Sequence, residues 1–189
     1  MSARIQEPAS TAGPDQRRDA LSPGPSQSNL LIKGVRDVRL LLIAIWLGAS
    51  IFFSFAVAPS VFAVLPTREL AGVVVSRTLG ILNTAGFVIS LVLLASAFLF
   101  KHIVSVRAFC LEVISLIVIA MSTFIGEWII AARMQALRAA MGRPMDEVLQ
   151  FDPSRIAFNS LHGYSVAFLS AAMFAAIVSL MLIARRAGS

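Results

Sequence analysis

Charged residues are scarce in this sequence of 189 residues: Asp, Glu, Lys and Arg supply 14% of it, whereas 58% is hydrophobic and the mean hydropathy is +0.84. A soluble domain carries about 25% charged residues, so the low charge argues strongly against a water-soluble enzyme. Cysteine is nearly absent as well. Cys110 stands alone, which excludes an internal disulfide and any C-x-x-C motif.

The charge that is present is mostly positive, with a formal net charge of +6. The Lys and Arg residues stand at the flanks of long apolar runs and do not form one basic stripe. Such flanking residues are typical of anchors at a membrane surface. The lipid bilayer is therefore the expected partner, and nucleic acid is not.

What the sequence has instead is a set of long apolar segments. They cover residues 40–65, 78–100, 108–132 and 156–184. Each exceeds the roughly 20 residues needed to cross a bilayer core of about 30 Å. Backbone groups in lipid must bond internally, and runs of this length exclude the short tilted strands of a barrel. The sequence thus predicts an all-α integral membrane protein, a bundle of four transmembrane helices within residues 36–186.

The N-terminal segment is of a different kind. Residues 1–29 are rich in Pro, Ser, Gln, Gly and charge, and have few large apolar residues. Such a segment cannot bury enough surface to offset its ordering entropy. Residues 30–39 mix apolar with charged side chains and are expected to form a short interfacial lead-in. The sequence therefore predicts a disordered N-terminal tail over residues 1–35.

Four spans place both termini on one side of the membrane. Ten of the 16 Lys and Arg residues fall on that side and six on the other. Without the three arginines of the distal tail, the numbers become seven and six. Both counts favour a cell-membrane protein with cytoplasmic termini, the second by a narrow margin.

The loop between the third and fourth spans carries helix stop and start signals. Apolar residues recur at helical spacing as far as Met141, so the third helix is expected to continue until Gly142 and Pro144 end it. The sequence Asp152-Pro153-Ser154 favours the start of the fourth helix. Asp or Ser can cap a helix, and Pro suits its first turn.

Small residues repeat every four positions in the fourth span. They are Ala167, Ala171, Ala175 and Ser179. Helices in lipid associate through such smooth faces and through interhelical hydrogen bonds. Ala44 with Gly48 makes a shorter face in the first span, and Gly80 with Thr84 another in the second. Packing inside one bundle is the favoured interpretation, and a homo-oligomer or a membrane protein partner is the alternative.

One polar or kinked position in each span falls at a common depth. Pro59, Asn83, Glu127 and His162 each lie five or six residues from one end of their span. At about 1.5 Å per residue this is roughly 8–9 Å inside the same membrane face, because successive spans alternate in direction. Pro59 also removes a helical hydrogen bond and predicts a kink. These four residues form a candidate intramembrane polar cluster.

Glu127 carries the energetic argument for this cluster. A carboxylate near the membrane centre costs on the order of 2.5–3.5 kcal/mol, and less at a shallower depth. Glu127 is therefore expected to bind a proton or to find a donor among His162, Asn83, Arg77 and Arg133. A structural polar knot is the favoured interpretation, and a site for a proton, an ion or a small ligand is the alternative.

Other chemistries are less well supported. One Glu, one His and one Asn are too few for a metal site, no cofactor is expected, and no arrangement of catalytic residues is evident. Glu112 lies about 22 Å from Glu127 along the third span. It is expected to form an ion pair at the interface, near Lys101, His102 and Arg107.

Several short motifs appear in a fixed order along the chain. They are Trp46-Leu47-Gly48, Phe52-Phe53, Ala58-Pro59-Ser60-Val61-Phe62, Ala71-Gly72, Asn83 with Gly86, Arg133, Leu137-Arg138, Phe158 and Leu161-His162-Gly163-Tyr164-Ser165. Over residues 38–184 the sequence resembles a bacterial four-span membrane domain of unknown function, number 4149, grouped as transmembrane protein 205-like. The resemblance implies a membrane location and no defined reaction. The eukaryotic relative is associated with tolerance of drugs and metal complexes.

The sequence leaves three kinds of function open. The first is a non-enzymatic multi-pass membrane protein that handles a proton, a metal ion or a small solute at the polar cluster. The second is a structural or accessory subunit that docks a membrane partner through its small-residue faces. The third, a membrane enzyme or electron carrier with a cofactor, is the least favoured.

Overall fold

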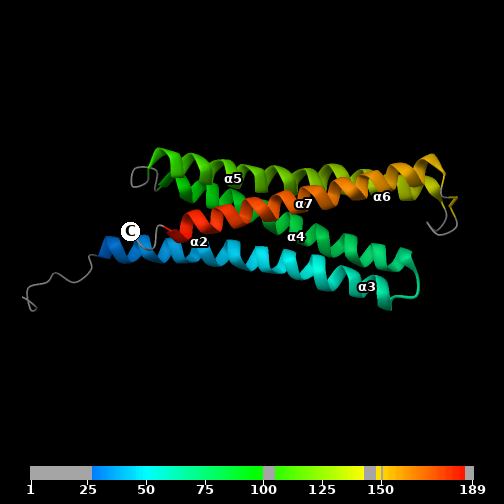
Figure 1. Ribbon diagram of the computed structural model, residues 1–189, viewed down its shortest axis with the longest axis horizontal. Helices are drawn as coiled ribbons and strands as arrows, with labels where there is room; N and C mark the ends of the chain where they lie inside the picture. The colour runs from blue at the N-terminus through cyan, green and yellow to red at the C-terminus, as the bar shows by residue number, and fades with distance from the viewer. Residues whose placement is uncertain (1–26, 100–104, 143–147, 150, 186–189) are drawn as a thin grey trace, which may run out of the picture. The chain divides into compact units, whose positions relative to one another are not determined.

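The computed structural model describes residues 27–99, 105–142, 148–149 and 151–185, and in this part of the chain it contains helices and no strand (Figure 1). The elements are α2 (Gln27–Phe52), η1 (Phe53–Val57), α3 (Ala58–Val64), α4 (Arg68–Leu99), α5 (Val106–Phe124), η2 (Ile125–Ala131), α6 (Ala132–Met141) and α7 (Pro153–Arg185), where η1 and η2 are π-helical. The predicted all-α class is confirmed.

Within the described residues, four continuous helical stretches are long and apolar enough to cross a membrane. They run over Leu30–Val64, Arg68–Phe98, Val106–Met141 and Pro153–Arg185. Large apolar side chains such as Leu41, Ile81, Ile114 and Phe174 are exposed on their outer faces, as expected for helices that lipid surrounds. These stretches correspond to the four predicted spans and indicate a membrane protein.

Two helices begin earlier than the apolar runs suggest. α2 starts at Gln27, so it includes residues 27–35 of the predicted tail, while residues 1–26 lie outside the described residues. Extending an existing helix costs little compared with starting one, and charged side chains do not stop it. α4 starts at Arg68, where Thr67 accepts a hydrogen bond on Oγ1 from the N–H of Leu70, 3.2 Å away.

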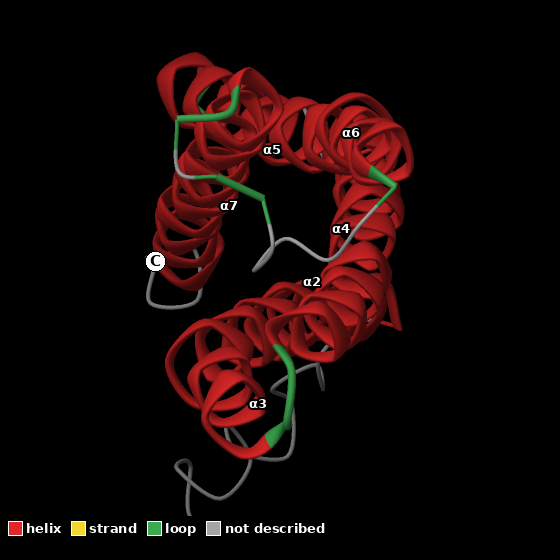
Figure 2. Ribbon diagram, turned by 90° about the vertical axis from the view of Figure 1, so that its right-hand side faces the viewer, coloured by secondary structure: helices red, strands yellow, loops and turns green. Residues whose placement is uncertain are grey.

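The chain divides after Val35 into two units, and the following description concerns the residues from Arg36 onward. α5 lies between α4 and α7 and packs along both (Figures 1 and 2). The buried core that joins the helices consists of Ile43, Trp46, Leu47, Leu93, Leu116, Ile119, Ala172 and Ala176. α2 is fixed to α4 by Trp46, whose Nε1–H donates to the carbonyl of Leu82 at 2.9 Å.

A charged pair is buried at the end of the bundle opposite the α3–α4 connection. Arg39 on α2 forms a salt bridge with Glu112 on α5, and the two residues are only 5% and 0% exposed. The same guanidinium donates to the carbonyl of Leu93 on α4 at 3.4 Å. The ion pair predicted for Glu112 is present, but its partner is Arg39 of α2, whereas Arg107 is exposed. Lys101 and His102 lie outside the described residues.

The buried face of α7 differs from the predicted small-residue face. Ser165, Ala172, Ala176, Ser179 and Ile183 are the buried residues of this helix. Of the predicted face, Ser179 is buried, Ala175 is half-buried, and Ala167 and Ala171 are exposed. Inside this chain the helix is turned so that Ala172 and Ala176 face the core. Ser179 contacts α5, with its Oγ 2.5 Å from the Oγ of Ser115.

The irregular points of the helices have local causes. Before Pro59, where the sequence predicts a kink, the N–H of Ala58 bonds to the carbonyl of Phe53, one residue further back than in an α-helix, which makes a π-helical turn. α6 ends at Met141, and Gly142 has a left-handed φ of 59°. The predicted stop is confirmed, and so is the predicted start of α7, where Asp152 accepts a hydrogen bond from the N–H of Ser154 at 2.8 Å.

Candidate functional site

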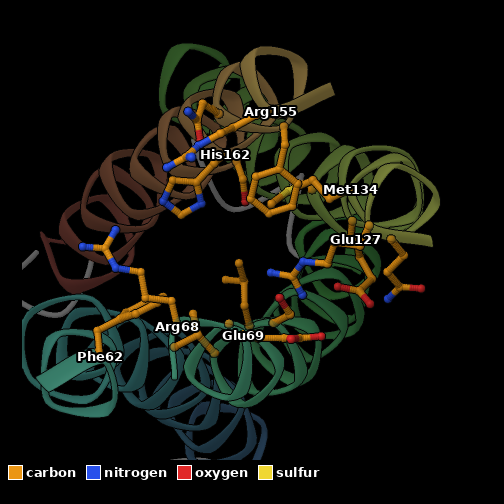
Figure 3. Close-up of a pocket in the computed structure, with 18 of the residues that line it drawn as sticks. Phe62, Arg68, Glu69, Glu127, Met134, Arg155 and His162 are labelled. Atoms are coloured by element: carbon orange, nitrogen blue, oxygen red, sulfur yellow. The ribbon is translucent and has the colours of Figure 1, made fainter. Parts of the chain in front are cut away.

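A cavity of about 340 Å³ lies between the helices at the end of the bundle where α4 and α7 begin (Figure 3). Its walls come from α3, α4, η2, α6 and α7. Small-molecule sites in proteins have volumes of roughly 300–1,000 Å³ and combine apolar walls with a few polar groups. Phe62, Leu79, Met134, Met141 and Phe158 supply apolar wall here, so both the size and the lining fit a small-ligand site.

Three of the four residues of the predicted polar cluster line this cavity. Asn83 comes from α4, Glu127 from η2 and His162 from α7. Pro59 is exposed and is not among the lining residues, and α3 contributes Phe62 in its place. The structure thus brings one side chain from each of three helices to a common space.

Arg77 and Arg133, the arginines predicted as donors for Glu127, are both exposed and do not line the cavity. Tyr164 is exposed and also lies outside the lining. A spacing of one or two residues from a lining position is enough to turn a side chain to another face of the helix.

Two glycines allow the polar side chains to lie close to the opposite helix. A Cβ on Gly80 of α4 would lie 2.9 Å from Oε1 and 3.1 Å from Oε2 of Glu127. A Cβ on Gly126 of η2 would lie 3.1 Å from Nδ2 of Asn83. Each helix therefore places a polar side chain against a glycine of the other. This reciprocal contact fixes the positions of both side chains at the wall of the cavity.

The π-helical turn η2 positions Glu127. A π-helical turn inserts an extra residue into the helix and changes the direction of the side chains that follow it, and such turns are frequent at functional sites. Here the turn covers Ile125–Ala131 and buries Gly126, while Glu127 is half-buried at the cavity. The apolar pattern of the third span gave no signal for this turn, because a π-helical turn has no distinctive composition.

Three arginines from three elements line the outer end of the cavity. Arg68 comes from the start of α4, Arg138 from α6 and Arg155 from the start of α7. Glu69 lines the same end and interacts electrostatically with Arg138. The sequence showed Arg68 and Arg155 only as flanking charges, and Arg138 only as part of the motif Leu137-Arg138. Their convergence depends on the packing of three helix ends.

Arg138 crosses the cavity from one wall to another. Its guanidinium carbon lies 5.0 Å from the ring centroid of Phe158 on α7, a cation–π contact. One of its nitrogens would lie 2.8 Å from a Cβ on Gly72 of α4. A larger residue at Gly72 would therefore push this guanidinium away from α4. Arg155 is held by a hydrogen bond that it donates to the carbonyl of Val148.

The cavity has two chemically different ends. Along α4, lining residues run from Arg68 to Asn83, a separation of fifteen residues or about 22 Å. The outer end carries the guanidinium groups, and the inner end carries an amide, a carboxylate and an imidazole. This combination suits a polar solute that forms several hydrogen bonds. Among the described residues, no three His, Cys, Asp or Glu side chains gather to hold a metal ion.

Comparison with known families gives one match. The family model described as Domain of unknown function (DUF4149) matches residues 41–143. This range includes Asn83, Glu127 and Arg138, whereas His162 and Arg155 follow it. The comparisons with curated proteins and with solved structures gave no match.

Proposed function

This chain belongs to the DUF4149 family, which assigns no activity, and we propose from the cavity that the protein binds a small polar solute within its helix bundle. In this proposal it is a non-enzymatic protein of the cell membrane, with both termini in the cytoplasm. Asn83, Glu127 and His162 form the inner part of the binding site. The single observation that carries the proposal is that three separate helices bring these side chains to one cavity.

The hydrogen-bonding pattern favours a ligand site over a structural polar knot. Within the described part of the chain, none of the three side chains forms a hydrogen bond with another protein group. A knot that holds helices in register would join them directly, as Ser115 and Ser179 are joined at 2.5 Å. Asn83 is buried, Glu127 is half-buried and His162 is exposed. Ionisable residues of membrane helices that face a cavity are typical of solute pathways.

Thiol accessibility tests whether the cavity admits solutes. In a Cys110→Ser background, Ser165→Cys places a thiol on the cavity wall, and Ser179→Cys places a matched thiol of the same helix in the buried contact with α5. A small methanethiosulfonate reagent is expected to modify Ser165→Cys at least tenfold faster than Ser179→Cys. Equal rates at the two positions would contradict the proposal.

A panel of polar metabolites tests binding itself. A ligand at 100 times its Kd stabilises the folded state by about 2.7 kcal/mol, so a bound solute is expected to raise the thermal midpoint of the purified protein. Glu127→Gln and His162→Ala are expected to abolish this rise while the variants still accumulate in the membrane. Arg133→Gln, outside the cavity, is the control and is expected to keep it. If no solute in the panel raises the midpoint and Ser165→Cys does not react, the proposal fails.

A second candidate function rests on the outer surface. Ala44, Gly48, Ala167 and Ala171 are exposed and leave smooth helix faces, which suit close packing in lipid. An accessory subunit would dock a membrane partner or a second copy there. We also propose, from the residues Leu161–Ser165, that the chain is similar to the transmembrane protein 205-like proteins. Co-purification of a partner that Ala171→Leu disrupts is the expected result for this alternative.

A further inference from the structure

We infer that the solute is an amphiphile with a hydroxylated head group. The head group binds at Asn83, Glu127 and His162, and the apolar chain leaves the cavity between α3 and α7. This inference rests on the proposed function, since it names the chemical class of the ligand for the same cavity. It adds a route by which the ligand reaches the site from the membrane.

The first and fourth spans separate toward the cavity. At one level α2 and α7 share the buried core, to which Trp46 and Ala176 both belong. Closer to the cavity α7 packs on α6, whereas α3 packs on α4 (Figures 1 and 2). In the described part of the chain, no interface of comparable extent joins α3 to α7. These two helices therefore form adjacent walls of the cavity that are not packed together.

The lining side chains on this side of the cavity are exposed, whereas those on the opposite wall are buried. Phe62 of α3 is 47% exposed, and Asn159 and His162 of α7 are exposed as well. Asn83 of α4 and Gly126 of η2 are buried. Figure 3 shows Phe62 and His162 on two different walls of the cavity. Among the described residues, this difference in exposure indicates that the cavity opens between α3 and α7.

The exposed polar groups lie at a depth where lipid is expected to surround the bundle. His162 is nine residues, or about 14 Å, beyond the start of α7 at Pro153. Ile156 and Val166, which precede and follow it on α7, are more than half exposed. An ionisable side chain of a membrane helix rarely faces lipid without a polar partner. A head group inside the cavity would supply this partner and would separate the imidazole from the lipid chains.

The inner end of the cavity suits a head group that both donates and accepts hydrogen bonds. The carboxylate of Glu127 accepts, whereas the amide of Asn83 and the neutral imidazole of His162 each donate and accept. A hydroxyl group donates one hydrogen bond and has two acceptor lone pairs. A head group with several hydroxyls can therefore bind all three side chains. A group that only accepts would leave the carboxylate without a donor.

The apolar part of the lining is placed for the chain of the amphiphile. Phe62 of α3 and Phe158 of α7 both line the cavity. The volume of about 340 Å³ is near the lower limit for small-molecule sites, which leaves room for a head group and not for a long chain. The chain is therefore expected to run past these two rings into the bilayer.

A photoreactive amphiphile tests where the chain lies. The probe is a 1-O-alkylglycerol with a diazirine in its chain, added to the full-length protein in phosphatidylcholine vesicles. Mass spectrometry of the peptides is expected to find at least fivefold more label on α3 and the first half of α7 than on the outer face of α5. Ile114 and Ile117 on that face are also exposed, so equal labelling of the three helices would overturn the inference.

Competition tests whether the labelled site is specific. An excess of a non-reactive alkylglycerol or of a diacylglycerol is expected to remove the preference for α3 and α7. The stronger competitor shows whether the ligand has one chain or two, and either result supports the inference. A preference that neither competitor removes would overturn it.

Adjacent residues of α7 provide a matched pair of variants for the route. Asn159 lines the cavity, whereas Ser160 is exposed and lies outside the lining. Asn159→Trp is expected to narrow the opening and to lower the competed label several-fold. Ser160→Trp is expected to leave the label unchanged. An equal effect of the two variants would contradict a route between α3 and α7.

The contribution of the head group is tested by His162→Ala, which is expected to lower the competed label several-fold. Should this variant fail to accumulate, a photoreactive alkane without the glycerol group is used on the unchanged protein. It is expected to label α3 and α7 no more than α5. If the alkane shows the same preference as the alkylglycerol, the polar residues do not select the ligand and the inference fails.

Thiol modification separates a failure of this inference from a failure of the proposed function. If Ser165→Cys reacts faster than Ser179→Cys but the alkylglycerol shows no preference, the cavity is open and only the inference fails. If Ser165→Cys reacts no faster than Ser179→Cys and the alkylglycerol shows no preference, the cavity is closed and both fail.

Discussion

A Cβ on Gly80 would lie 2.9 Å from Oε1 of Glu127, so the carboxylate rests directly on the backbone of α4. Asn83, one turn further along α4, lies in the same way against Gly126 of η2. The two contacts join the second and third spans at the depth of the candidate site. They also give each polar side chain one defined position at the cavity wall.

Substitution of Gly80 is expected to move Glu127 into the cavity. In Gly80→Ala the added methyl group meets the flexible end of a side chain, and alanine favours a helix by about 1 kcal/mol over glycine. The thermal midpoint is therefore expected to change little. Modification of Ser165→Cys, which lies deeper, is expected to slow several-fold, whereas Ser76→Cys, nearer the outer end, keeps its rate. Gly163→Ala, with nothing within 4 Å, is the control.

Gly86 is expected to be far less tolerant than Gly80. A Cβ there would lie 2.6 Å from two atoms of the Trp46 indole, whose Nε1–H is bonded to the carbonyl of Leu82. The rigid indole of Trp46 is packed in the core and cannot move aside, whereas the flexible side chain of Glu127 at Gly80 can. Overpacking of this kind costs about 1–3 kcal/mol, so Gly86→Ala is expected to lower the thermal midpoint in detergent by several degrees. An unchanged midpoint would show that α2 is packed loosely on α4.

The buried pair of Arg39 and Glu112 is expected to respond differently to single and double substitution. Removal of one partner of a buried ion pair leaves a charge in a dry interior and costs about 3–5 kcal/mol. Arg39→Leu and Glu112→Leu should each strongly reduce the stability or the yield of the protein. The double variant removes both charges and is expected to recover most of the loss. If the double variant loses as much stability as the two single variants lose together, the result would argue against a direct pair.

Two adjacent alanines of α7 distinguish packing inside the bundle from packing outside it. Ala172 is 0% exposed and belongs to the core, whereas Ala171 is exposed. Ala172→Leu is expected to force α7 away from its neighbours and to lower the thermal midpoint, as overpacking does. Ala171→Leu is expected to leave the midpoint unchanged. Size-exclusion chromatography of Ala171→Leu then reports on any partner or second copy at the outer face.

The sequence by itself determined the class of the fold and many of the helix boundaries. Each apolar run is long enough to cross a bilayer core as a helix, and a run of this kind has few alternative structures. Local chemistry also set the end of α6 at Met141 and the capping of α7 by Asp152, because glycine stops and side-chain caps act over a few residues. Depth along each span placed Asn83, Glu127 and His162 at a level where the structure has a cavity.

Only the tertiary structure decided which side chains face one another. The rotation of α7 about its own axis turns Ala172 inward and Ala171 outward. The depth of a residue within its span does not determine this rotation. The pairing of Arg39 with Glu112 and the convergence of Arg68, Arg138 and Arg155 join residues that are far apart in the sequence. Such contacts depend on how ridges and small residues of neighbouring helices fit together. That fit is a property of the packed bundle and not of any single span.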